Sequence, residues 1–339
     1  MKWLITGGAG FIGCNTALRL MRSGADVLIY DNLARQGSAR NLDWLQAQGS
    51  CRFIKGDVRS FTNLEDLFRA HPDLDVILHL AAQVAVTTSV TSPRDDFEIN
   101  ALGTFNICEA VRLFTPKAIL LNASTNKVYG EMTHVRVIER EGRYAYADLP
   151  GGVSEDQTLD FHSPYGCSKG TGDQYVKDYA RIYGLRTVTF RQSCIYGPRQ
   201  FGVEDQGWVA WLTIASLLGR TITIYGDGKQ VRDVLSVDDL VDCYLRSVDA
   251  IDRISGRVYN VGGGPQNTLS LLELLELLEV ALGKAIPRQW ADWRAGDQRV
   301  FVCDISKAKR ELDWEPRVSK TLGVGRLIDW ITDNRSLFG

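Results

Sequence analysis

Residues 2–13 of the chain read KWLITGGAGFIG, a short apolar run followed by glycines at positions 7, 10 and 13 and by the start of an apolar helical pattern. At such glycines the backbone turns tightly, brings the helix close to the strand, and lets a pyrophosphate approach the amide groups at the helix N-terminus. The stretch therefore predicts a strand, a phosphate-binding turn and a helix. The alternative is a glycine turn that only precedes a core helix.

Short apolar runs alternate with helical patterns through the first half of the chain. The runs of strand length are residues 3–5, 27–30, 52–54, 76–80, 118–121 and 187–190. The helical patterns between them are residues 12–23, 64–70, 100–113 and 168–183. Because helices that cover both faces of a parallel sheet alternate with its buried strands, the pattern predicts an α/β fold with a doubly wound parallel sheet, the Rossmann arrangement.

After about residue 191 this rhythm loosens, and turns rich in glycine separate shorter elements. We expect residues 1–190 to form the dinucleotide-binding domain and residues 191–339 to form mainly a smaller α/β substrate-binding domain. Segments within residues 234–261 have enough strand or helix character to return to the first domain, so we expect an interleaved boundary. The leucine-rich run at 269–282 is interrupted by glutamates and predicts an amphipathic helix.

The composition is typical of a folded globular protein and narrows its partners. The 339 residues include 39 Lys and Arg against 41 Asp and Glu, a formal net charge of −2, which argues against a protein that coats nucleic acid. No run approaches the roughly 18 apolar residues of a membrane span, and no secretory leader is visible. Seven scattered cysteines without a Cys-x-x-Cys pair, beside four histidines, predict reduced thiols in a cytoplasmic protein and no metal site.

Acidic residues at strand ends indicate how a dinucleotide is selected. Asp31 ends the second predicted strand, 24 residues after Gly7, where its carboxylate would accept hydrogen bonds from an adenosine ribose. Its charge would repel the 2′-phosphate of NADP, so NAD is the expected cofactor. Arg35 is placed to bind a 2′-phosphate, to lie over the adenine or to be a solvated loop charge. Asp57 follows the third strand and either contacts the adenine amino group or caps the next helix.

Residues 163–169, SPYGCSK, begin a second informative helix. Ser163 suits the N-cap and Pro164 the first helical position, which places Tyr165 in the first turn. Lys169 follows four residues later on the same face, so its ammonium and the helix N-terminus are both expected to favour the phenolate of Tyr165. We therefore expect the pKa of this phenol, ordinarily about 10, to fall toward neutrality and make Tyr165 a usable base.

A polar stretch, NASTNKVYG at residues 122–130, follows the strand at 118–121, at the sheet edge where open α/β folds bind ligands. With the glycine turn and the Tyr-x-x-x-Lys pair, it makes the chain resemble the extended short-chain dehydrogenases/reductases, the superfamily of nucleotide-sugar epimerases and dehydratases, over nearly its whole length. The resemblance implies that Thr125 hydrogen-bonds the reacting hydroxyl. It also implies that Tyr165 acts as base while Lys169 holds the tyrosine and the nicotinamide ribose.

The same resemblance extends the expected contacts with NAD and implies a homodimer. The expected NAD-binding residues are Gly7, Gly10, Phe11, Ile12, Gly13, Asp31, Asn32, Arg35, Asp57, Val58, Leu80, Ala81, Ala82, Asn100, Ser124, Tyr165 and Lys169. In many relatives the outer faces of two helices pair between subunits, and the matching helices here are 100–113 and 168–183. We therefore expect a homodimer, with a tetramer as the other arrangement.

The two positions after Thr125 separate the chemistries of the superfamily. Members that eliminate water carry an Asp-Glu pair there, whereas this chain has Asn126 and Lys127 and so lacks the proton donors for dehydration. The blocks at 159–169 and 205–209 are similar to the branch that inverts C2 of CDP-linked hexoses by transient oxidation to a 2-keto sugar. The alternatives are a 4-epimerase of another nucleotide sugar and a non-catalytic scaffold that binds NAD.

A sugar nucleotide carries two phosphate charges, which arginine forks suit. The resemblance implies that Arg232, with Arg294 or Arg299, holds the diphosphate, and Arg199 is a further candidate. The expected substrate-binding residues are Thr125, Asn126, Arg199, Gln206, Arg232, Arg294 and Arg299. For any single arginine, a surface salt bridge is the competing interpretation. The chemistry of these residues does not identify the cytosine, so the CDP group enters only through the resemblance.

Overall fold

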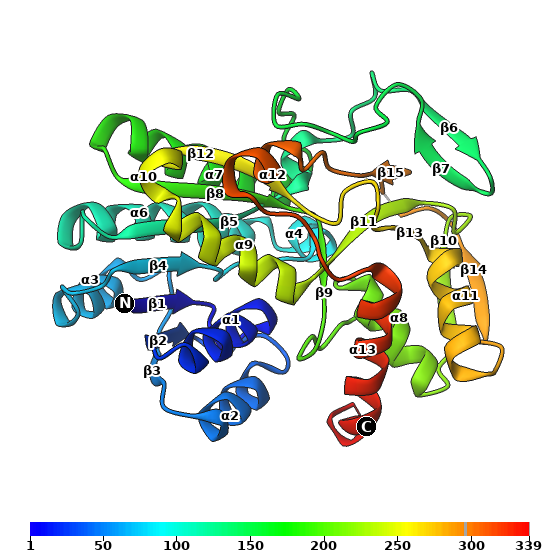
Figure 1. The fold of residues 1–339 in the computed structure, drawn as a ribbon, viewed down its shortest axis with the longest axis horizontal. Coiled ribbons are helices and arrows are strands. Elements are labelled where there is room, and N and C mark those ends of the chain that lie inside the picture. Colours follow the sequence, from blue (N-terminus) through cyan, green and yellow to red (C-terminus); the bar gives the residue numbers. More distant parts are fainter. Residues whose placement is uncertain (295–296, 339) are drawn as a thin grey trace.

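The main sheet contains seven parallel strands in a computed structural model that describes residues 1–294 and 297–338. Their order is β12-β8-β5-β4-β1-β2-β3, and neighbouring strands pair in parallel register. The strands are β1 (Lys2–Thr6), β2 (Asp26–Asp31), β3 (Arg52–Lys55), β4 (Val76–His79), β5 (Ile119–Thr125), β8 (Arg186–Gln192) and β12 (Arg257–Val261). This order steps outward from β1 in both directions, which confirms the doubly wound sheet expected from the sequence (Figure 1).

Helices cover both faces of this sheet, and alternate residues of each strand point to opposite faces. One face carries α1 (Phe11–Arg22), α2 (Ser38–Gln48), α9 (Val237–Asp249) and α12 (Ser306–Leu312), and the other carries α3 (Phe61–Ala70), α6 (Gly103–Phe114) and α7 (Ser163–Tyr183). In β1, Ile5 packs with the first group and Leu4 with the second, and both are fully buried. Burial on both faces explains why these strands read as continuous apolar runs.

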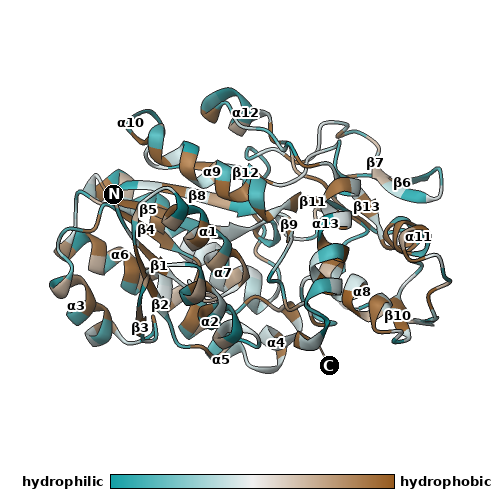
Figure 2. Ribbon diagram, turned by 60° about the horizontal axis from the view of Figure 1, so that its bottom comes forward, coloured by the Kyte–Doolittle hydropathy of each residue, from teal (hydrophilic) through white to brown (hydrophobic). Residues whose placement is uncertain are grey.

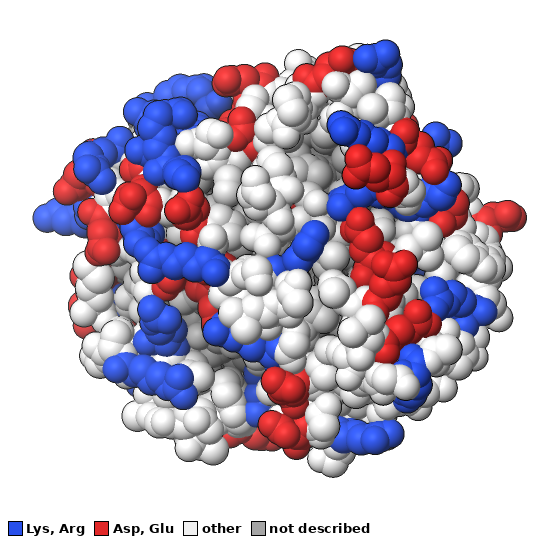
Figure 3. All heavy atoms as spheres, turned by 45° about the vertical axis from the view of Figure 1, so that its right-hand side comes forward, with Lys and Arg blue, Asp and Glu red and all other residues white. Residues whose placement is uncertain are grey.

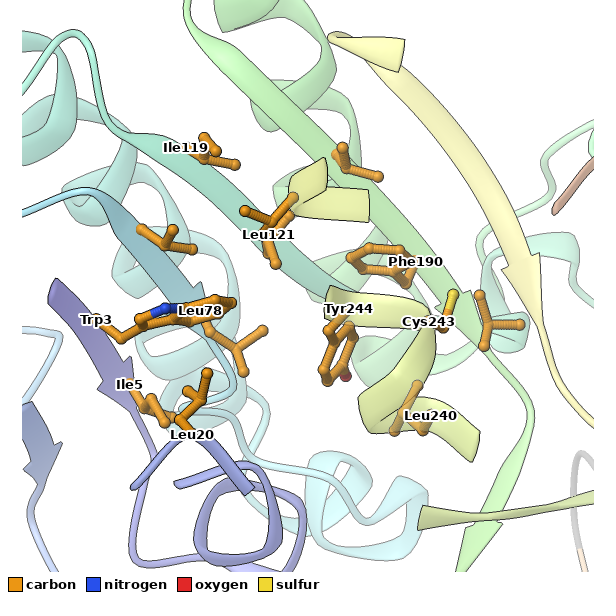
Figure 4. Close-up of a cluster of buried hydrophobic side chains, with 14 of the residues drawn as sticks. Trp3, Ile5, Leu20, Leu78, Ile119, Leu121, Phe190, Leu240, Cys243 and Tyr244 are labelled. Carbon is orange, nitrogen blue, oxygen red and sulfur yellow. The ribbon is translucent and has the colours of Figure 1, made fainter. Parts of the chain in front are cut away.

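The core on the α1 and α9 face joins distant parts of the chain (Figure 4). Phe190 of β8 meets Tyr244 of α9 edge to face, with ring centroids 5.0 Å apart. The Tyr244 hydroxyl is buried in this core and accepts a hydrogen bond from the Gln192 side chain at 2.5 Å. Aromatic pairs of this geometry contribute about 0.5–1.5 kcal/mol beyond the burial of their area. A helix from the second half of the chain thus completes the core of the main sheet.

Several elements differ from the expected pattern. Helix α2 and the short helices α4 (Val86–Thr91) and α5 (Pro93–Phe97) were not expected, since α4 and α5 are too short to show a helical period and α2 buries few apolar residues. The pattern at 100–113 is a π-helical turn, Glu98–Leu102, followed by α6. Such turns recur at functional sites, and this one lies beneath the loop that follows β4.

The rest of the chain forms smaller sheets and helices beyond the carboxyl ends of the main strands (Figure 1). Its strands are β9 (Cys194–Tyr196), β10 (Ile222–Tyr225), β11 (Val231–Ser236), β13 (Thr268–Ser270), β14 (Arg288–Ala291), β15 (Val300–Phe301) and the hairpin of β6 (Val137–Arg140) and β7 (Arg143–Tyr146). Its helices are α8 (Trp208–Leu217), α11 (Leu271–Leu282) and α13 (Lys320–Asp333); the single turn α10 (Ile251–Ile254) follows α9.

Helix α11 is the amphipathic helix expected from the leucine-rich run. Ser270 and Glu273 form a capping box at its N-terminus, in which each side chain accepts a hydrogen bond from the other residue's backbone N–H. Leu274, Leu275 and Leu278 are fully buried in the core that α8 and α13 share. Apolar and polar faces of the helices therefore separate as the fold requires (Figure 2).

The surface mixes charges of both signs. Lys and Arg side chains alternate with Asp and Glu over the face shown in Figure 3, whose central part is mostly uncharged. Among the described residues no helix has the length and apolar character needed to cross a membrane. In residues 1–294 and 297–338, no three His, Cys, Asp or Glu side chains are grouped to hold a metal ion.

Candidate active site

Two adjoining cavities lie at the carboxyl ends of the main strands. The first, of about 380 Å³, is lined by the glycine turn after β1 and by the ends of β2, β4 and β5; we call it the turn cavity. The second, of about 330 Å³, is lined by Arg232, Arg294 and part of α8; we call it the arginine cavity. Tyr165 and Gln206 line both, so the cavities meet at the predicted base. Open α/β sheets bind ligands at this edge.

The glycine turn between β1 and α1 leaves no room for side chains. Gly7 has a φ of +68°, and a Cβ there would lie 2.7 Å from the backbone nitrogen of Ala81. A Cβ on Gly13 would lie 2.5 Å from the carbonyl oxygen of Gly7. Gly10 is the N-cap of α1, and no side chain caps the first turn of the helix. The backbone N–H groups of that turn therefore remain available to a ligand. This backbone fits the pyrophosphate of a dinucleotide.

Asp31 ends β2 beside this turn. Its Oδ2 accepts a hydrogen bond from the Ala9 N–H at 3.0 Å, and its Oδ1 accepts one from the Leu33 N–H at 2.7 Å. Burial raises the pKa of the Asp31 carboxyl, and these two hydrogen bonds act in the opposite direction. The carboxylate lines the turn cavity and retains lone pairs for ribose hydroxyls, as the prediction for NAD requires.

Arg35 and Asp57 line the same cavity and have side-chain partners of their own. The Arg35 guanidinium donates to Gln206 Oε1 at 2.6 Å, which links the loop after β2 to the second part of the chain. The Asp57 carboxylate accepts hydrogen bonds from Arg59, which lowers the pKa of Asp57 to about 2. The side-chain cap of α3 is Ser60, so the capping role considered for Asp57 is wrong. A contact with adenine stays a prediction.

Most of the predicted cofactor residues line the turn cavity. They are Gly7, Gly10, Phe11, Ile12, Gly13, Asp31, Asn32, Arg35, Asp57, Val58, Leu80, Ala81, Ala82, Ser124, Tyr165 and Lys169. Asn100 is the exception, because its side chain is buried in the π-helical turn. Its amide exchanges hydrogen bonds with the backbone N–H and C=O of Gln83, at 2.9 and 3.0 Å. Asn100 therefore shapes the cavity wall through the loop after β4 and does not line the cavity itself.

Tyr165, Thr125 and Lys169 come together where the cavities meet. Tyr165 lies in the first turn of α7, where Ser163 Oγ accepts the Gly166 N–H at 3.3 Å, although His162 is the residue that flanks the helix. The Tyr165 side chain lines the arginine cavity together with the Thr125 side chain at the end of β5. All three residues are at least nine-tenths buried. The structure thus brings together the three residues that the sequence pattern singled out.

The electrostatics of this group differ from the expectation. Burial raises the pKa of Tyr165 to about 12, and Asp96 acts in the same direction, against the influence of Thr125. Lys169 Nζ donates to the Ala123 carbonyl oxygen at 2.5 Å, and burial lowers the pKa of this lysine to about 8. The chain's own groups therefore do not lower the pKa of Tyr165 in the way expected from Lys169, because burial of the phenol is the largest influence and Lys169 is not among the others.

A buried polar network behind the site was not predicted. Asp173 of α7 is fully buried, accepts a hydrogen bond from Ser124 Oγ at 2.8 Å, and forms an ion pair with Arg191 at 2.9 Å. The Lys169 ammonium is attracted to Asp173. These partners belong to β5, α7 and β8, so they fix the strand ends relative to the helix that carries Tyr165. Only long-range contacts reveal this network, and no sequence pattern marks it.

The arginine cavity contains most of the predicted substrate residues. Thr125, Asn126, Gln206, Arg232 and Arg294 line it. Arg232 pairs with Asp297 at 2.8 Å, and Arg294 pairs with Glu204 at 3.3 Å and with Asp205 at 3.6 Å.

Two predicted substrate arginines lie elsewhere. Arg199 lines the turn cavity, with its guanidinium carbon 4.0 Å from the Trp44 ring centroid. Arg299 lines neither cavity, because its guanidinium lies over Tyr144 at 5.2 Å and Trp293 at 5.8 Å. Neither arginine lines the arginine cavity, and their contact with the substrate stays a prediction. Positive charge near a glycine-rich turn in the sequence did not show which cavity the side chain would enter.

Lys127 is a cavity residue whose contribution the sequence did not reveal. Its Nζ donates to Gln298 Oε1 at 3.2 Å, and the side chain lines the arginine cavity beside Asn126. Burial lowers the pKa of Lys127 to about 8, and the charge of Arg232 acts in the same direction. The sequence could have indicated this role, because Lys127 directly follows Asn126, which was expected to bind the substrate. The sequence analysis considered Lys127 only as a residue that replaces an acid of the dehydratases. The arginine cavity thus contains three cationic side chains, which suits an anionic ligand.

A family model described as the NAD dependent epimerase/dehydratase family matches residues 3–262 of the chain. The CDP-paratose 2-epimerase of Salmonella typhi is 46% identical over 335 residues, which cover 97% of this chain and 99% of that protein. Both matches extend over most of the chain, so they include the glycine turn, the Thr125 stretch and the helix of Tyr165.

Solved structures of similar proteins share the fold over nearly the whole chain. The UDP-glucose 4-epimerase of Thermotoga maritima, solved with UDP-glucose, has a TM-score of 0.86 at 30% identity and covers 99% of this chain and 100% of its own. The UDP-glucose 4-epimerase of Thermus thermophilus, solved in complex with NAD, has a TM-score of 0.81 at 30% identity, with 98% and 99% covered. The chain therefore shares the fold of these proteins, including the placement of the smaller sheets and helices beyond the carboxyl ends of the main strands.

Proposed function

This chain belongs to the NAD-dependent epimerase/dehydratase family, and we propose that it inverts C2 of a CDP-linked hexose, with CDP-paratose to CDP-tyvelose as the leading reaction and CDP-glucose as a further substrate. The observation that supports this most is the meeting of the two cavities at Tyr165. One cavity fits NAD and the other fits a sugar nucleotide, so the reacting carbon would lie beside both the cofactor and a base. The identity with the 2-epimerase supports the position C2 and the CDP group.

The carboxylates of the arginine cavity favour epimerisation over elimination of water. The positions that hold the acid and base in dehydratases are Asn126 and Lys127 here. The acidic residues that line this cavity are Glu204, Asp205 and Asp297, and each pairs with an arginine. Because an arginine engages each of these carboxylates, none of them is left free to act as the acid of an elimination. The described part of the cavity therefore offers Tyr165 as its acid and base.

The mechanism that we propose follows from the positions of Tyr165, Thr125 and Lys169. NAD, held by the residues of the turn cavity, would supply a hydride acceptor that can later return the hydride. The Tyr165 oxygen removes the proton of the 2-hydroxyl group and gives it back after inversion. Thr125, which lines the same cavity as Tyr165, would orient the hydroxyl. Lys169, whose Nζ donates to the Ala123 carbonyl oxygen, ties α7 to the end of β5. The 2-keto sugar would turn its other face toward the hydride donor before it is reduced. Because the hydride returns to the sugar, the net redox change is zero.

The arginine cavity would anchor the nucleotide while the hexose turns. Arg232 and Arg294 present guanidinium forks that suit a diphosphate, and Gln206 and Asn126 offer amide groups nearby. The partners of these arginines, such as Asp297, would share or yield their hydrogen bonds when the diphosphate binds. Anchoring at the phosphates leaves the sugar free to rotate about the bonds to the phosphate, as inversion requires.

A direct test compares sugar nucleotides in deuterium oxide. Incubation with CDP-paratose or CDP-glucose should give the C2-inverted product without deuterium bound to carbon, because the hydride stays inside the protein. Turnover of UDP-glucose at C4 with no reaction of CDP-sugars would support a 4-epimerase instead. Failure to convert any sugar nucleotide while NAD remains bound would favour a non-catalytic scaffold. Native mass spectrometry of the purified protein should detect bound NAD and any retained sugar nucleotide.

We also propose a homodimer, a cytoplasmic location and a division of labour along the chain. Exposed apolar side chains occur on α5, α6 and α7, including Phe97, Leu113, Ile182 and Tyr183. A second copy of the chain would bury this surface, and light scattering after gel filtration should give twice the monomer mass of 37.8 kDa.

The seven described cysteines are free thiols, in keeping with a reducing compartment. Residues 1–190 with segments near 234–261 would bind NAD, and residues 191–339 would mainly bind the sugar nucleotide.

A further inference from the structure

Arg199 is a buried arginine in the turn cavity to which the proposed mechanism gives no role. It follows β9 in the turn Gly197-Pro198-Arg199, and the residue is 8% exposed. The guanidinium carbon lies 4.0 Å from the ring centroid of Trp44 in α2 and 5.8 Å from that of Trp330 in α13. The two indoles therefore form an aromatic cage around the guanidinium, contributed by both parts of the chain.

The described residues provide no anion for this cation. The ion pairs found in residues 1–294 and 297–338 do not include Arg199, and its Nε is buried without a hydrogen-bond partner. Burial lowers the pKa of Arg199, the only opposing influence being the thiol of Cys14. An arginine nevertheless keeps its proton in a protein, and a buried charge is costly unless an ion of opposite sign accompanies it. The side chain is therefore arranged for an anionic ligand.

The backbone at Arg199 is fixed in a strained conformation. Its φ is +70°, a value that residues other than glycine rarely adopt. The Arg199 carbonyl oxygen accepts a hydrogen bond from the Asn41 side chain at 3.2 Å, and the Pro198 carbonyl oxygen accepts one from the Asn15 side chain at 2.9 Å. Side chains of α1 and α2 thus hold the turn against the dinucleotide-binding part. Strain that several contacts maintain is typical of a ligand site.

We propose that Arg199 binds a phosphate group of the dinucleotide, and that α13 belongs to the cofactor site because Trp330 completes the cage. The charge of Arg199 acts on Cys14 in the first helical turn after the glycines, which places the cation close to the N–H groups that suit a pyrophosphate. The planar guanidinium can offer two parallel hydrogen bonds to phosphate oxygens, and its contacts with the two indole rings hold it in place. This inference rests on the proposed binding of NAD.

The test measures binding of NAD to protein stripped of cofactor, by calorimetry, for wild type and for Arg199→Gln. Loss of a charge-assisted bond to phosphate should weaken NAD binding at least about tenfold. Adenosine, which has no phosphate, should bind both proteins equally, and so should CDP, since Arg199 lies outside the arginine cavity. Arg326→Gln is the matched control, because Arg326 lies on α13 but is half exposed and pairs with Asp238 at 3.5 Å; it should bind NAD like wild type.

A second variant keeps the inference testable if Arg199→Gln does not fold. Trp330→Leu retains the arginine but removes one wall of the cage, and it should weaken NAD binding about threefold to tenfold without changing adenosine binding. Equal NAD affinity in wild type, Arg199→Gln and Trp330→Leu would overturn the inference and leave the proposed function intact. A loss of CDP affinity in Arg199→Gln with NAD affinity unchanged would also overturn it. A wild-type protein that binds no NAD would contradict the proposed function itself.

Discussion

The turn cavity and the arginine cavity adjoin each other but are built differently. Much of the turn cavity is made from backbone, at the ends of consecutive strands and at glycines such as Gly7 and Gly13, where a side chain would collide. The arginine cavity is made from side chains that come from distant segments, and Arg232 and Arg294 hold their places through carboxylate partners. A site built from backbone leaves a contiguous motif in the sequence. A site built from side chains leaves scattered residues whose partners only the folded structure shows.

The largest expected effect concerns Tyr165, which belongs to both cavities. Tyr165→Phe should lower kcat about 10³-fold, because the variant lacks the oxygen that moves the proton of the substrate hydroxyl. NAD should remain bound, since the turn cavity keeps its glycines and Asp31. Tyr175→Phe on the same helix, 43% exposed, is the control and should retain wild-type kcat. A Tyr165→Phe protein within a few fold of wild type would remove the catalytic assignment.

The next effect tests whether the turn cavity depends on backbone. Gly13→Ala places a Cβ 2.5 Å from the Gly7 oxygen and 2.6 Å from the Gly8 Cα, so the helix and the turn must separate. We expect NAD affinity to fall about 100-fold, measured by calorimetry on stripped protein. Gly325→Ala in α13 meets no atom within 4 Å and should raise the free energy of unfolding by about 0.5–1 kcal/mol. Unchanged NAD affinity in Gly13→Ala would contradict a backbone-built site.

A smaller effect is expected in the arginine cavity. Arg232→Gln should raise KM for the sugar nucleotide about tenfold and change kcat little, because the diphosphate is held equally in the ground state and the transition state. NAD affinity should stay at the wild-type value, which separates the two cavities. Steady-state kinetics and NAD calorimetry on the same preparation check this. A fall in kcat with KM unchanged would show that Arg232 acts in the chemical step.

The smallest effect is a pH dependence of CDP binding through Lys127. Burial lowers its pKa from 10.5 to about 8, so its charge is lost as the pH rises through 8. We expect CDP affinity to fall severalfold between about pH 7 and 9 in wild type. Lys127→Met should bind CDP more weakly at pH 7 and show a flatter profile. A wild-type affinity that stays constant over this range would place the Lys127 charge outside the ligand's reach.

The same shift in Lys127 has a consequence for stability. Its folded-state pKa is depressed, so the unfolded chain binds more protons between about pH 8 and 10.5. The contribution of this lysine to the free energy of unfolding therefore rises with pH across that window and is lost as the pH falls through 8. Because the buried charge of Lys127 opposes folding, Lys127→Met should have a higher free energy of unfolding than wild type at pH 7.5. Urea titrations of both proteins at pH 7.5 and 9.5 measure this difference, which should narrow at the higher pH.

The sequence predicted the main sheet, the glycine turn and Asp31 because they follow from local patterns, whereas most other residues of the turn cavity were expected only from the resemblance. Apolar runs buried on two faces indicate the strands, and the glycine spacing indicates the turn at Gly7. Tyr165 and Lys169 were predicted from their spacing on one helix. Their pKa values were not, because desolvation depends on which elements cover them. Asn100 was assigned to the cofactor, whereas it supports the Gln83 loop from a π-helical turn that no periodicity indicates.

Arginines were the residues that the sequence resolved least well. Arg199, Arg232, Arg294 and Arg299 look alike as charges near turns, and the structure separates them into the turn cavity, the arginine cavity and an aromatic stack outside both. The destination of a long side chain depends on its tertiary partners, such as Trp44 for Arg199. Trp44 lies 155 residues from Arg199, and Asp297 lies 65 residues from Arg232, so no short window of sequence contains these pairs.

The most direct measurement of the account follows one hydrogen atom. A CDP-hexose labelled with deuterium at C2 is incubated with the protein in ordinary water until epimers equilibrate, and the product is analysed by NMR and mass spectrometry. Removal and return of the same hydride between two faces of the sugar predicts a product that is inverted at C2 and keeps its deuterium there. An inverted product that has exchanged its deuterium for solvent hydrogen would contradict the account.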